Sequence, residues 1–379
     1  MLRQYKLRNY NFKLIFFVIA LSIIGYFAIG SAKESVQSRQ MYGILVGIIV
    51  MIIVSLVDYN LYAHVKWILY IVNIVLLIAV LLFGVEVNRS TRWINIGFQF
   101  QPSELAKILL ILFFSQFIMK YKDRINTFKL IMFMIMLVAI PMLLIFKEPD
   151  LSTTIMVGVT FCIMLFVGGL EYRIVLIVLG ALIPAGIVFF SIILQEGQTI
   201  LQNYQVRRIL AWLYPEKYAD SDAYQQLNSI TAISSGMLNG KGLNNNVIAS
   251  VKNGNFISEP QTDFIYAVIG EEMGFIGAAA VIVLLFLIAY ECMRIAHFSP
   301  NLSGAIVADA MAGMIAIQGF MNIAVTTGLF PNTGIPLPFV SYGLTSLVSL
   351  YIGIGVVLNV GLQGDKRKKT TMDLWTDAL

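Results

Sequence analysis

Long hydrophobic runs alternate with short polar segments along most of the chain. A run of about 17 or more apolar residues is long enough to cross a lipid bilayer as a helix. The pattern therefore predicts an all-α polytopic integral membrane protein, with one membrane domain over residues 1–379 and about ten transmembrane helices. The ten runs are residues 14–31, 41–57, 66–84, 104–119, 128–146, 152–169, 174–193, 263–290, 304–328 and 340–362.

The composition supports this class. Hydrophobic residues make up 58% of the 379 residues and charged residues only 12%, whereas soluble domains are about 45–50% apolar and about 25% charged. A net charge of +5 is no sign of nucleic-acid binding here, because in a membrane protein the position of each charge matters more than the sum. The two cysteines, Cys162 and Cys292, fall in or beside different apolar runs and indicate neither a disulfide framework nor a thiolate metal site.

Lysine and arginine are concentrated in the connections that share a side with the N-terminus, and the positive-inside rule therefore predicts that both termini are cytoplasmic. Residues 363–379 then form a basic cytoplasmic tail. Basic residues before the first run, and the small residues 30–32 after it, resemble a signal peptide. We expect an uncleaved helix instead, because a chain with many spans needs no removable leader.

One connection is much longer than the others. Residues 194–262 link the seventh and eighth runs and are predicted to lie outside the cell. A loop of this length is usually functional or disordered, and its aromatic residues favour packing on the outer face of the bundle. Within it, QVRRILAWLYPEKY predicts a short interfacial helix. A second outer loop, residues 85–103, carries an arginine and a tryptophan suited to the interface.

The start of the fourth run, at the outer side, combines charges with a helix N-terminus. Ser103 is a candidate N-cap, and Glu104 in the first turn suits the positive end of the helix. Lys107 opposes the helix dipole. It either pairs with Glu104 and extends to the surface, or joins Arg92 and the helix N-terminus in binding a phosphate.

Two further stretches place polar groups near the same outer boundary of the membrane. Asp150 is a candidate N-cap for the sixth run. Gln318, Asn322 and Thr326 share one face of the ninth run, which favours hydrogen bonding between helices, with a polar groove as the alternative. The proline-rich segment 331–343 cannot be helical. Irregular backbone at membrane depth is tolerated only beneath protein or beside a water-filled cavity, so we expect a cavity near the outer surface.

The segment 258–277, SEPQTDFIYAVIGEEMGFIG, carries four carboxylates into the eighth run. Asp263 lies at the water boundary, where an isolated aspartate could be only a helix cap. Beside a cationic phosphate site, however, it suggests proton transfer to or from a lipid-linked phosphorylated substrate. Glu271 and Glu272 lie about 12–13 Å further along a helix, and we expect them to pair with other helices. The glycines among residues 270–277 predict a close-packing face.

Two tempting motifs fail. The glycine-rich stretch 236–242 has three residues between its first glycines instead of four, and no Ser or Thr follows the lysine, so it is not a phosphate-binding P-loop. His64 and His297 are both predicted to be cytoplasmic and cannot join the outer carboxylates in a metal site.

Six stretches in order along the chain carry a recognisable pattern: RWINIGFQFQPSELAKI (92–108), EPDLSTT (148–154), RRILAWLYPE with YQQLNSI (207–230), SGMLNGKGL (235–243), TDFIYAVIGEEMGFIG (262–277) and TGIPLPFVSYG (333–343). Together they resemble the SEDS family of the RodA, FtsW and SpoVE proteins. The short tail, the loop pattern and GIPLPF look most like RodA.

The resemblance implies a ten-span peptidoglycan glycosyltransferase that polymerises lipid II at the outer face of the bacterial cytoplasmic membrane. It implies that Asp263, in the TDF element, is the essential aspartate, which we interpret as the general base for the acceptor sugar. It also implies a divalent cation, Mg²⁺ or Mn²⁺, whose ligands are unknown, and a class B penicillin-binding protein as partner within the elongation or division machinery. The implied substrate-binding residues are Arg92, Glu104, Lys107, Asp150, Glu259 and Ser341.

Two departures from the family pattern affect loop geometry. Gln261 stands where the family has a histidine before TDF, and Leu344 follows Gly343 where the family has a second glycine. Two other functions stay open: a transporter that flips lipid II, which the polar groups inside the ninth run also fit, and a scaffold that only recruits a transpeptidase. Charges gathered at the outer boundary, and not through the whole membrane depth, favour the enzyme.

Overall fold

The computed structural model describes residues 9–87, 90–95, 97–193, 203–243 and 256–364. Most of these residues are helical. The long helices are α1 (Phe12–Ala32), α2 (Glu34–Leu56), α3 (Tyr62–Phe83), α4 (Pro102–Lys120), α5 (Phe128–Lys147), α6 (Leu151–Val167), α7 (Tyr172–Ile193), α11 (Ile265–His297), α12 (Leu302–Thr326) and α13 (Leu344–Gln363). The shorter ones are α8 (Asn203–Leu213) and α9 (Tyr224–Ser235), with single 3₁₀ turns at η2 (Tyr59–Leu61), η3 (Lys122–Arg124) and η4 (Pro215–Tyr218).

Each of the ten predicted apolar runs coincides with one long helix. Within the described residues, eight of these helices are long and apolar enough to cross a membrane, and α6 is a shorter apolar helix of 17 residues. The predicted class, a multi-helix membrane protein, is confirmed. The boundaries moved most at α2, which begins at Glu34, and at α11, which continues to His297. Helix α13 begins only at Leu344, because the proline-rich segment before it is not helical.

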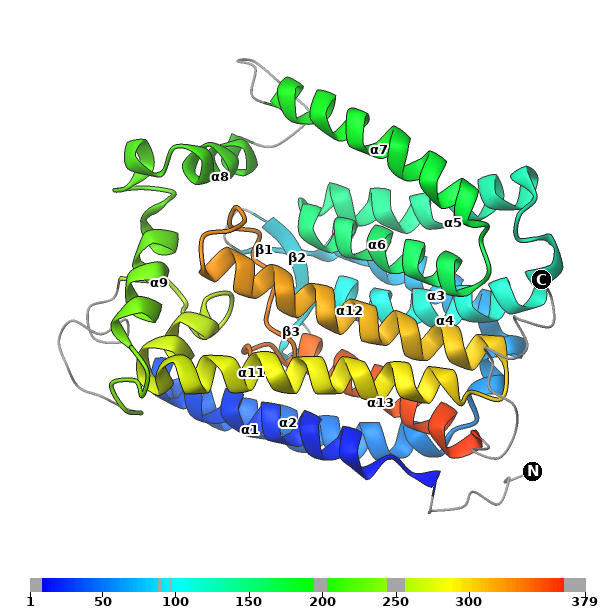
Figure 1. The fold of residues 1–379 in the computed structure, drawn as a ribbon, viewed down its shortest axis with the longest axis horizontal. Helices are drawn as coiled ribbons and strands as arrows, with labels where there is room; N and C mark the ends of the chain where they lie inside the picture. Colours follow the sequence, from blue (N-terminus) through cyan, green and yellow to red (C-terminus); the bar gives the residue numbers. More distant parts are fainter. Residues whose placement is uncertain (1–8, 88–89, 96, 194–202, 244–255, 365–379) are drawn as a thin grey trace.

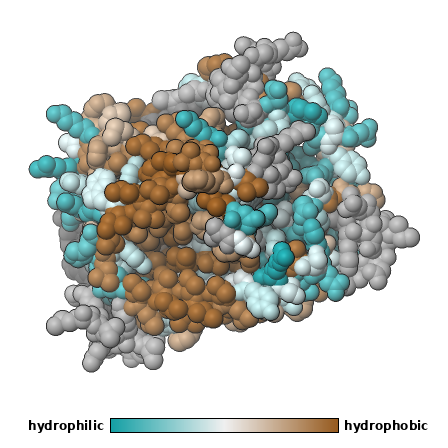
Figure 2. Space-filling model, turned by 180° about the vertical axis from the view of Figure 1, so that it is seen from behind, coloured by the Kyte–Doolittle hydropathy of each residue, from teal (hydrophilic) through white to brown (hydrophobic). Residues whose placement is uncertain are grey.

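The outer surface of the bundle is strongly apolar, as a lipid solvent requires. Figure 2 shows a broad hydrophobic band across one face, with hydrophilic residues toward both ends. Large side chains such as Phe16, Ile49 and Ile71 on α1, α2 and α3 are more than half exposed. By contrast, α4 is buried along nearly its whole length, and Phe113, Phe114 and Phe117 form part of the core.

The long helices lie side by side, so the molecule has two distinct ends (Figure 1). The strands, α8, α9 and the start of α11 lie toward one end, which we call the site end. The start of α1 and the end of α13 lie at the opposite end. The main helix pairs that build the bundle are α2 with α13, α11 with α12, α3 with α4 and α1 with α11.

A small β-sheet at the site end was not predicted from the sequence. Strands β1 (Val85–Val87), β2 (Ser90–Asn95) and β3 (Gln99–Phe100) form an antiparallel meander between α3 and α4. Thr345 Oγ1 joins this sheet to the start of α13, since it donates to Gln99 O at 3.2 Å and accepts from Gln101 N at 3.2 Å. The sheet thereby fixes β2, and with it Arg92, against the helical bundle.

The predicted short helix in the long loop is confirmed as α8, and α9 follows it. Gly270 and Gly274 of α11 do pack closely, Gly270 against Ile233 of α9 and Gly274 against the segment that follows α9. A Cβ on Gly236 would lie 1.9 Å from Gly270 O, and a Cβ on Gly240 would lie 2.1 Å from Glu272 O. Gly274 (φ 62°, ψ −162°) interrupts the helical geometry of α11 at this contact.

Gly274→Ala is expected to destabilise the protein. The backbone at Gly274 lies in a region essentially restricted to glycine, where another residue costs about 1–3 kcal/mol, and the added Cβ would lie 2.3 Å from Gly240 N. Thermal unfolding of the purified protein in detergent measures the effect. Gly186→Ala in α7 is the matched control, because its Cβ would have nothing within 4 Å. Equal unfolding midpoints for the two variants would contradict this account.

Candidate functional site

Asp263 lies directly before α11, at the site end of the bundle. Its backbone carbonyl accepts a hydrogen bond of 2.7 Å from Asn322 Nδ2 of α12. The same amide group donates to Ile335 O at 2.8 Å. One buried side chain thus holds both the aspartate and the proline-rich segment 331–343 against α12.

Protein side chains satisfy the irregular backbone of segment 331–343. Gln318 Nε2 donates to Pro336 O at 3.0 Å, and Ser152 Oγ donates to Thr333 O at 2.6 Å. The small cavity of about 10 Å³ beside Lys107 is lined by residues of α4, α5 and α6 and not by this segment, so the cavity expected here stays a prediction. These hydrogen bonds show that protein groups satisfy part of the irregular backbone, as membrane depth requires.

Ser341 lies in this segment and is buried. Its Oγ donates to Thr262 O at 2.6 Å and accepts from Leu337 N at 2.8 Å. Next to it, Tyr342 N donates to Gln261 O at 2.8 Å. Ser341 therefore fastens the proline-rich segment to the residues just before Asp263, and both of its hydrogen bonds go to backbone. Its predicted contact with substrate stays a prediction.

Arg208 of α8 lies near the Asp263 carboxylate. A Cβ built on Gly334 would lie 3.4 Å from Asp263 Oδ2 and 4.0 Å from Arg208 Nη1, so the two side chains converge at this glycine. The guanidinium lies 5.5 Å from the ring centre of Tyr204, one helical turn earlier, and Nη1 donates to Asn332 O at 3.5 Å. Sequence reasoning missed Arg208: an aromatic and an arginine four residues apart on one face of a short helix indicate a cation–π pair, but not a position beside Asp263.

Burial and neighbouring charges act in opposite directions on Asp263. Burial raises the pKa of the carboxyl above its usual range, while Arg208 and then Arg92 lower it, and Asp150 adds a smaller upward effect. Burial likewise lowers the pKa of the Arg208 guanidinium, an effect that Asp263 opposes. The site therefore holds a carboxyl of raised pKa between two arginines.

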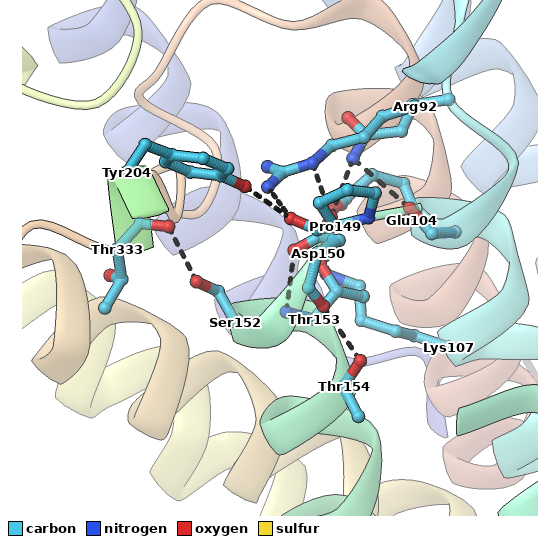
Figure 3. Close-up of polar contacts among 12 residues, drawn as sticks. Arg92, Glu104, Lys107, Pro149, Asp150, Ser152, Thr153, Thr154, Tyr204 and Thr333 are labelled. Atoms are coloured by element: carbon cyan, nitrogen blue, oxygen red, sulfur yellow. Dashed lines mark hydrogen bonds and ion pairs between the residues drawn. The ribbon is translucent and has the colours of Figure 1, made fainter. Parts of the chain in front are cut away.

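Arg92 and Asp150 form the second charged group of the site (Figure 3). Arg92 Nε lies 3.7 Å from Asp150 Oδ2, and Arg92 Nη2 donates to Pro149 O. Tyr204 OH also donates to Pro149 O, at 3.0 Å, so α8 and β2 meet at the start of α6. Asp150 caps α6 as predicted, since its Oδ1 accepts from Thr153 N at 3.0 Å.

Glu104 and Lys107 form a buried ion pair, with Lys107 Nζ 2.9 Å from Glu104 Oε1. The predicted pairing is confirmed, but the predicted extension to the surface is wrong, because Lys107 is only 5% exposed and donates to Gln318 Oε1 at 3.3 Å. Ser103 is not the N-cap either. Helix α4 begins one residue earlier at Pro102, which suits the first helical position.

Glu148 lies between α5 and α6 and is fully buried. Burial raises its pKa to about 9, the Asp150 carboxylate adds to this, and Arg92 opposes it. Its carboxyl group is therefore neutral near pH 7. A neutral carboxyl avoids the cost of burying a second negative charge beside Asp150.

The other carboxylates of segment 258–277 are paired. Glu259 lies 3.1 Å from Lys33 Nζ at the end of α1, and both side chains are about half exposed. Gln261 Nε2 donates to the Glu259 carboxylate. Glu272 contacts another helix as expected, since Ser31 Oγ of α1 donates to it, whereas Glu271 pairs with Lys241 of the non-helical segment after α9, with Nζ 2.7 Å from Oε1.

Leu344, where the sequence departs from the SEDS pattern, packs toward α2. A Cβ on Gly43 would lie 2.7 Å from Leu344 Cδ2. Its side chain therefore fills the contact between α2 and α13.

The sequence left two roles open for the polar face of α12: hydrogen bonding between helices or a polar groove. Gln318 and Asn322 bind the backbone of segment 331–343, and Thr326 Oγ1 donates to Ile323 O at 2.9 Å within its own helix. Of these three, only Gln318 makes the predicted bond to another helix, since its Oε1 accepts from Lys107 Nζ of α4 at 3.3 Å, whereas Asn322 bonds only non-helical backbone.

Comparison with known proteins places the chain among cell-wall proteins. The family model of the FtsW, RodA and SpoVE cell cycle proteins matches residues 7–366. Stage V sporulation protein E of Bacillus subtilis (strain 168) is 36% identical over 327 residues, covering 85% of this chain and 86% of the relative. The peptidoglycan glycosyltransferase MrdB of Escherichia coli (strain K12) is 30% identical over 354 residues, 92% of each protein.

A solved structure has the same architecture. It comes from a peptidoglycan synthase complex described by its structural coordination of polymerization and crosslinking. Its matching chain superposes with a TM-score of 0.76 at 27% identity, covering 93% of this chain and 97% of that one.

Glu104→Gln is expected to destabilise the protein by about 3–5 kcal/mol, because it leaves the buried Lys107 without its counter-charge. The double variant Glu104→Gln/Lys107→Met is expected to lose less than the sum of the two single variants. Thermal unfolding of the four proteins in detergent completes this cycle. Additive losses would mean that the buried pair does not couple.

Proposed function

This chain belongs to the FtsW, RodA and SpoVE family, and we propose that it polymerises lipid II into glycan strands at the outer face of the membrane. It is a peptidoglycan glycosyltransferase and a multi-pass protein of the bacterial cytoplasmic membrane. The observation that carries the proposal is the convergence of one carboxyl, Asp263, with two arginines, Arg92 and Arg208, at one end of the bundle.

The proposed topology has ten spans and both termini in the cytoplasm. The lysine and arginine distribution supports it, because the connections that share a side with the N-terminus are the basic ones. In this topology the site end of the bundle faces the outside. Lipid II presented there would place its diphosphate at the membrane surface and its sugars in water.

The proposed reaction joins an acceptor sugar to a lipid-linked donor. The Asp263 carboxylate takes the proton of the acceptor 4-hydroxyl as its oxygen bonds to the anomeric carbon of the donor. The bond from that carbon to the diphosphate breaks, and the diphosphate leaves with the electron pair. A positioned general base contributes about 10²–10⁴-fold to such a step.

The environment of Asp263 suits a base. An ordinary aspartate, with a pKa of about 3.9, binds a proton weakly at neutral pH. Burial raises this pKa, and the arginines limit the rise and so keep the charged form available. Arg208 and Arg92 also offer planar donors for phosphate oxygens, and we assign them to the departing diphosphate.

The other predicted substrate-binding residues fall into two groups, one exposed to solvent and one buried. Glu259 is exposed and lies four residues before the base, within reach of a bound sugar. Glu104, Lys107 and Asp150 are buried and paired, which supports a role in fixing α4, α6 and β2. Substrate would meet them only after those helices part.

A divalent cation is proposed only as a companion of the substrate. Among the residues that the structure describes, no three His, Cys, Asp or Glu side chains gather into a group that could hold a metal. These residues do not fit a resident metal site, and the reaction above is written without one. Mg²⁺ is commonly held by one or two carboxylates together with substrate phosphates, so the cation would arrive with the diphosphate.

A class B penicillin-binding protein is the proposed partner. The similar chain of known structure belongs to a complex that coordinates polymerization with crosslinking, and a polymerase of this family needs a transpeptidase to crosslink its product. The short tail and GIPLPF segment support assignment to the RodA type, which serves elongation and cell shape.

Asp263→Asn is expected to abolish glycan polymerisation, because the amide cannot accept the proton of the acceptor hydroxyl. The assay uses purified protein and lipid II in detergent, with products separated by size. A flippase or a scaffold would form no polymer even as wild type, since detergent removes the two sides that transport requires. Unfolding midpoints should match, and polymer from the asparagine variant would refute the base.

Arg208→Gln is expected to move the acid limb of the pH–rate profile to higher pH. The arginine lowers the pKa of Asp263, so its loss leaves the carboxyl protonated over a wider range, and activity at the lower pH values falls. Arg207→Gln is the matched control, because its guanidinium pairs with Asp222 at 2.7 Å instead. Profiles that fall by the same factor at every pH would contradict this coupling.

Removal of divalent cations with EDTA is expected to lower the polymerisation rate, and Mg²⁺ or Mn²⁺ should restore it. Because the protein holds no described cage for the ion, the unfolding midpoint of the substrate-free protein should not change with EDTA. A metal-dependent midpoint would point to a resident site instead.

A further inference from the structure

A second cavity lies at the end of the bundle opposite to the site. It measures about 260 Å³, and its walls come from the start of α1, the end of α11 and the end of α13. This is far more than the roughly 10–15 Å³ that one water requires. Its lining includes Asn11, Phe12, Lys13, Arg294, Ile295 and Phe298.

The position of this cavity corresponds to a lipid headgroup layer. Helix α11 starts next to Asp263 and has 33 residues, so at about 1.5 Å per residue it reaches about 50 Å, less what the bend at Gly274 removes. A bilayer with its headgroups is about 40–45 Å thick. If the Asp263 end lies at one surface, Arg294 lies at the headgroups of the other leaflet.

The cavity offers cations in a fixed arrangement. Arg294 Nη2 lies 2.7 Å from Glu291 Oε2, and the same oxygen accepts from Asn11 Nδ2 at 2.8 Å. Glu291 therefore orients the arginine and the N-cap of α1 together. Lys13 lies in the first turn of α1, is exposed, and adds a second cation beside the positive end of that helix.

Negative charges near the cavity would repel a bound anion, but they are outnumbered by cations. Glu291 balances one cation, and the C-terminal ends of α11 and α13 carry partial negative charge. In the sequence, further cations precede and follow the residues that line the cavity. Arg3, Lys6 and Arg8 precede Asn9 in the sequence, and Gly364 is followed by one aspartate and then by four basic residues, 366–369.

We propose that this cavity binds the phosphate and glycerol of an anionic phospholipid, with Lys13 and Arg294 as the phosphate donors. Basic pockets between helices on the cytoplasmic side favour such headgroups. Phe12, Ile295 and Phe298 give the cavity apolar walls, which suit the glycerol and the first carbons of the acyl chains. A free phosphate ion would use the cations and leave these walls without a partner.

The test measures lipid affinity of the purified full-length protein in detergent. Phosphatidylglycerol is titrated against the thermal unfolding midpoint, with phosphatidylcholine of the same acyl chains as the uncharged comparison. Phosphatidylglycerol should raise the midpoint more. Lys13→Gln and Arg294→Gln should each weaken its apparent affinity by about fivefold, as expected for one basic residue at a membrane surface.

Lys129→Gln is the matched control, because Lys129 is exposed in the first turn of α5 at the same end but does not line the cavity. Its affinity should equal that of the wild type. If Arg294→Gln fails to fold, the lipid affinity of Lys13→Gln alone tests the proposal. Equal responses to both lipids, unchanged affinity in Lys13→Gln, or an equal midpoint shift with inorganic phosphate alone would each overturn the proposal.

Discussion

The hydrogen bonds of Asn322 join the two stretches of non-helical backbone on which the site depends. Peptide groups at membrane depth must find partners within the protein, because the lipid offers none. Asn322 supplies a donor to Asp263 O and another to Ile335 O from one buried position on α12. Ser341 then ties the two stretches directly to each other. The place of the aspartate thus follows from satisfying backbone groups.

Most charged side chains at the site end lie beside a side chain of opposite charge. Glu104 pairs with Lys107, Asp150 with Arg92, and Asp263 faces Arg208. Buried pairs of this kind add little net stability, yet losing one partner is costly. Two of the pairs join different parts of the site, β2 to the start of α6 and α8 to the start of α11. The pair within α4 links that helix to α12 through the bond from Lys107 to Gln318. Electrostatics thereby fixes geometry around the carboxyl that reacts.

The sequence predicted what depends on long patterns. Ten apolar runs became ten helices, Asp150 capped α6, and the prolines excluded a helix before α13. The strands at residues 85–100 were missed because strands of two to six residues carry little periodic signal, and the sheet is anchored by Thr345, which is distant in sequence. Arg208 was missed because nothing local connects α8 with Asp263. The bend at Gly274 depends on a close approach by residues 237–242, which no local pattern records.

The most direct test of this account is the rate of lipid II polymerisation by Asn322→Leu. This variant keeps the size of the side chain and removes both donors, and Asn322 itself lies beneath the backbone it holds. A small misplacement of a catalytic group can cost about 10²-fold, so the account predicts a fall in kcat of that order with KM much less affected. Thr326→Val, one turn along the same helix, should keep the wild-type rate. Wild-type kcat in folded Asn322→Leu would contradict the claim that this hydrogen bond positions Asp263.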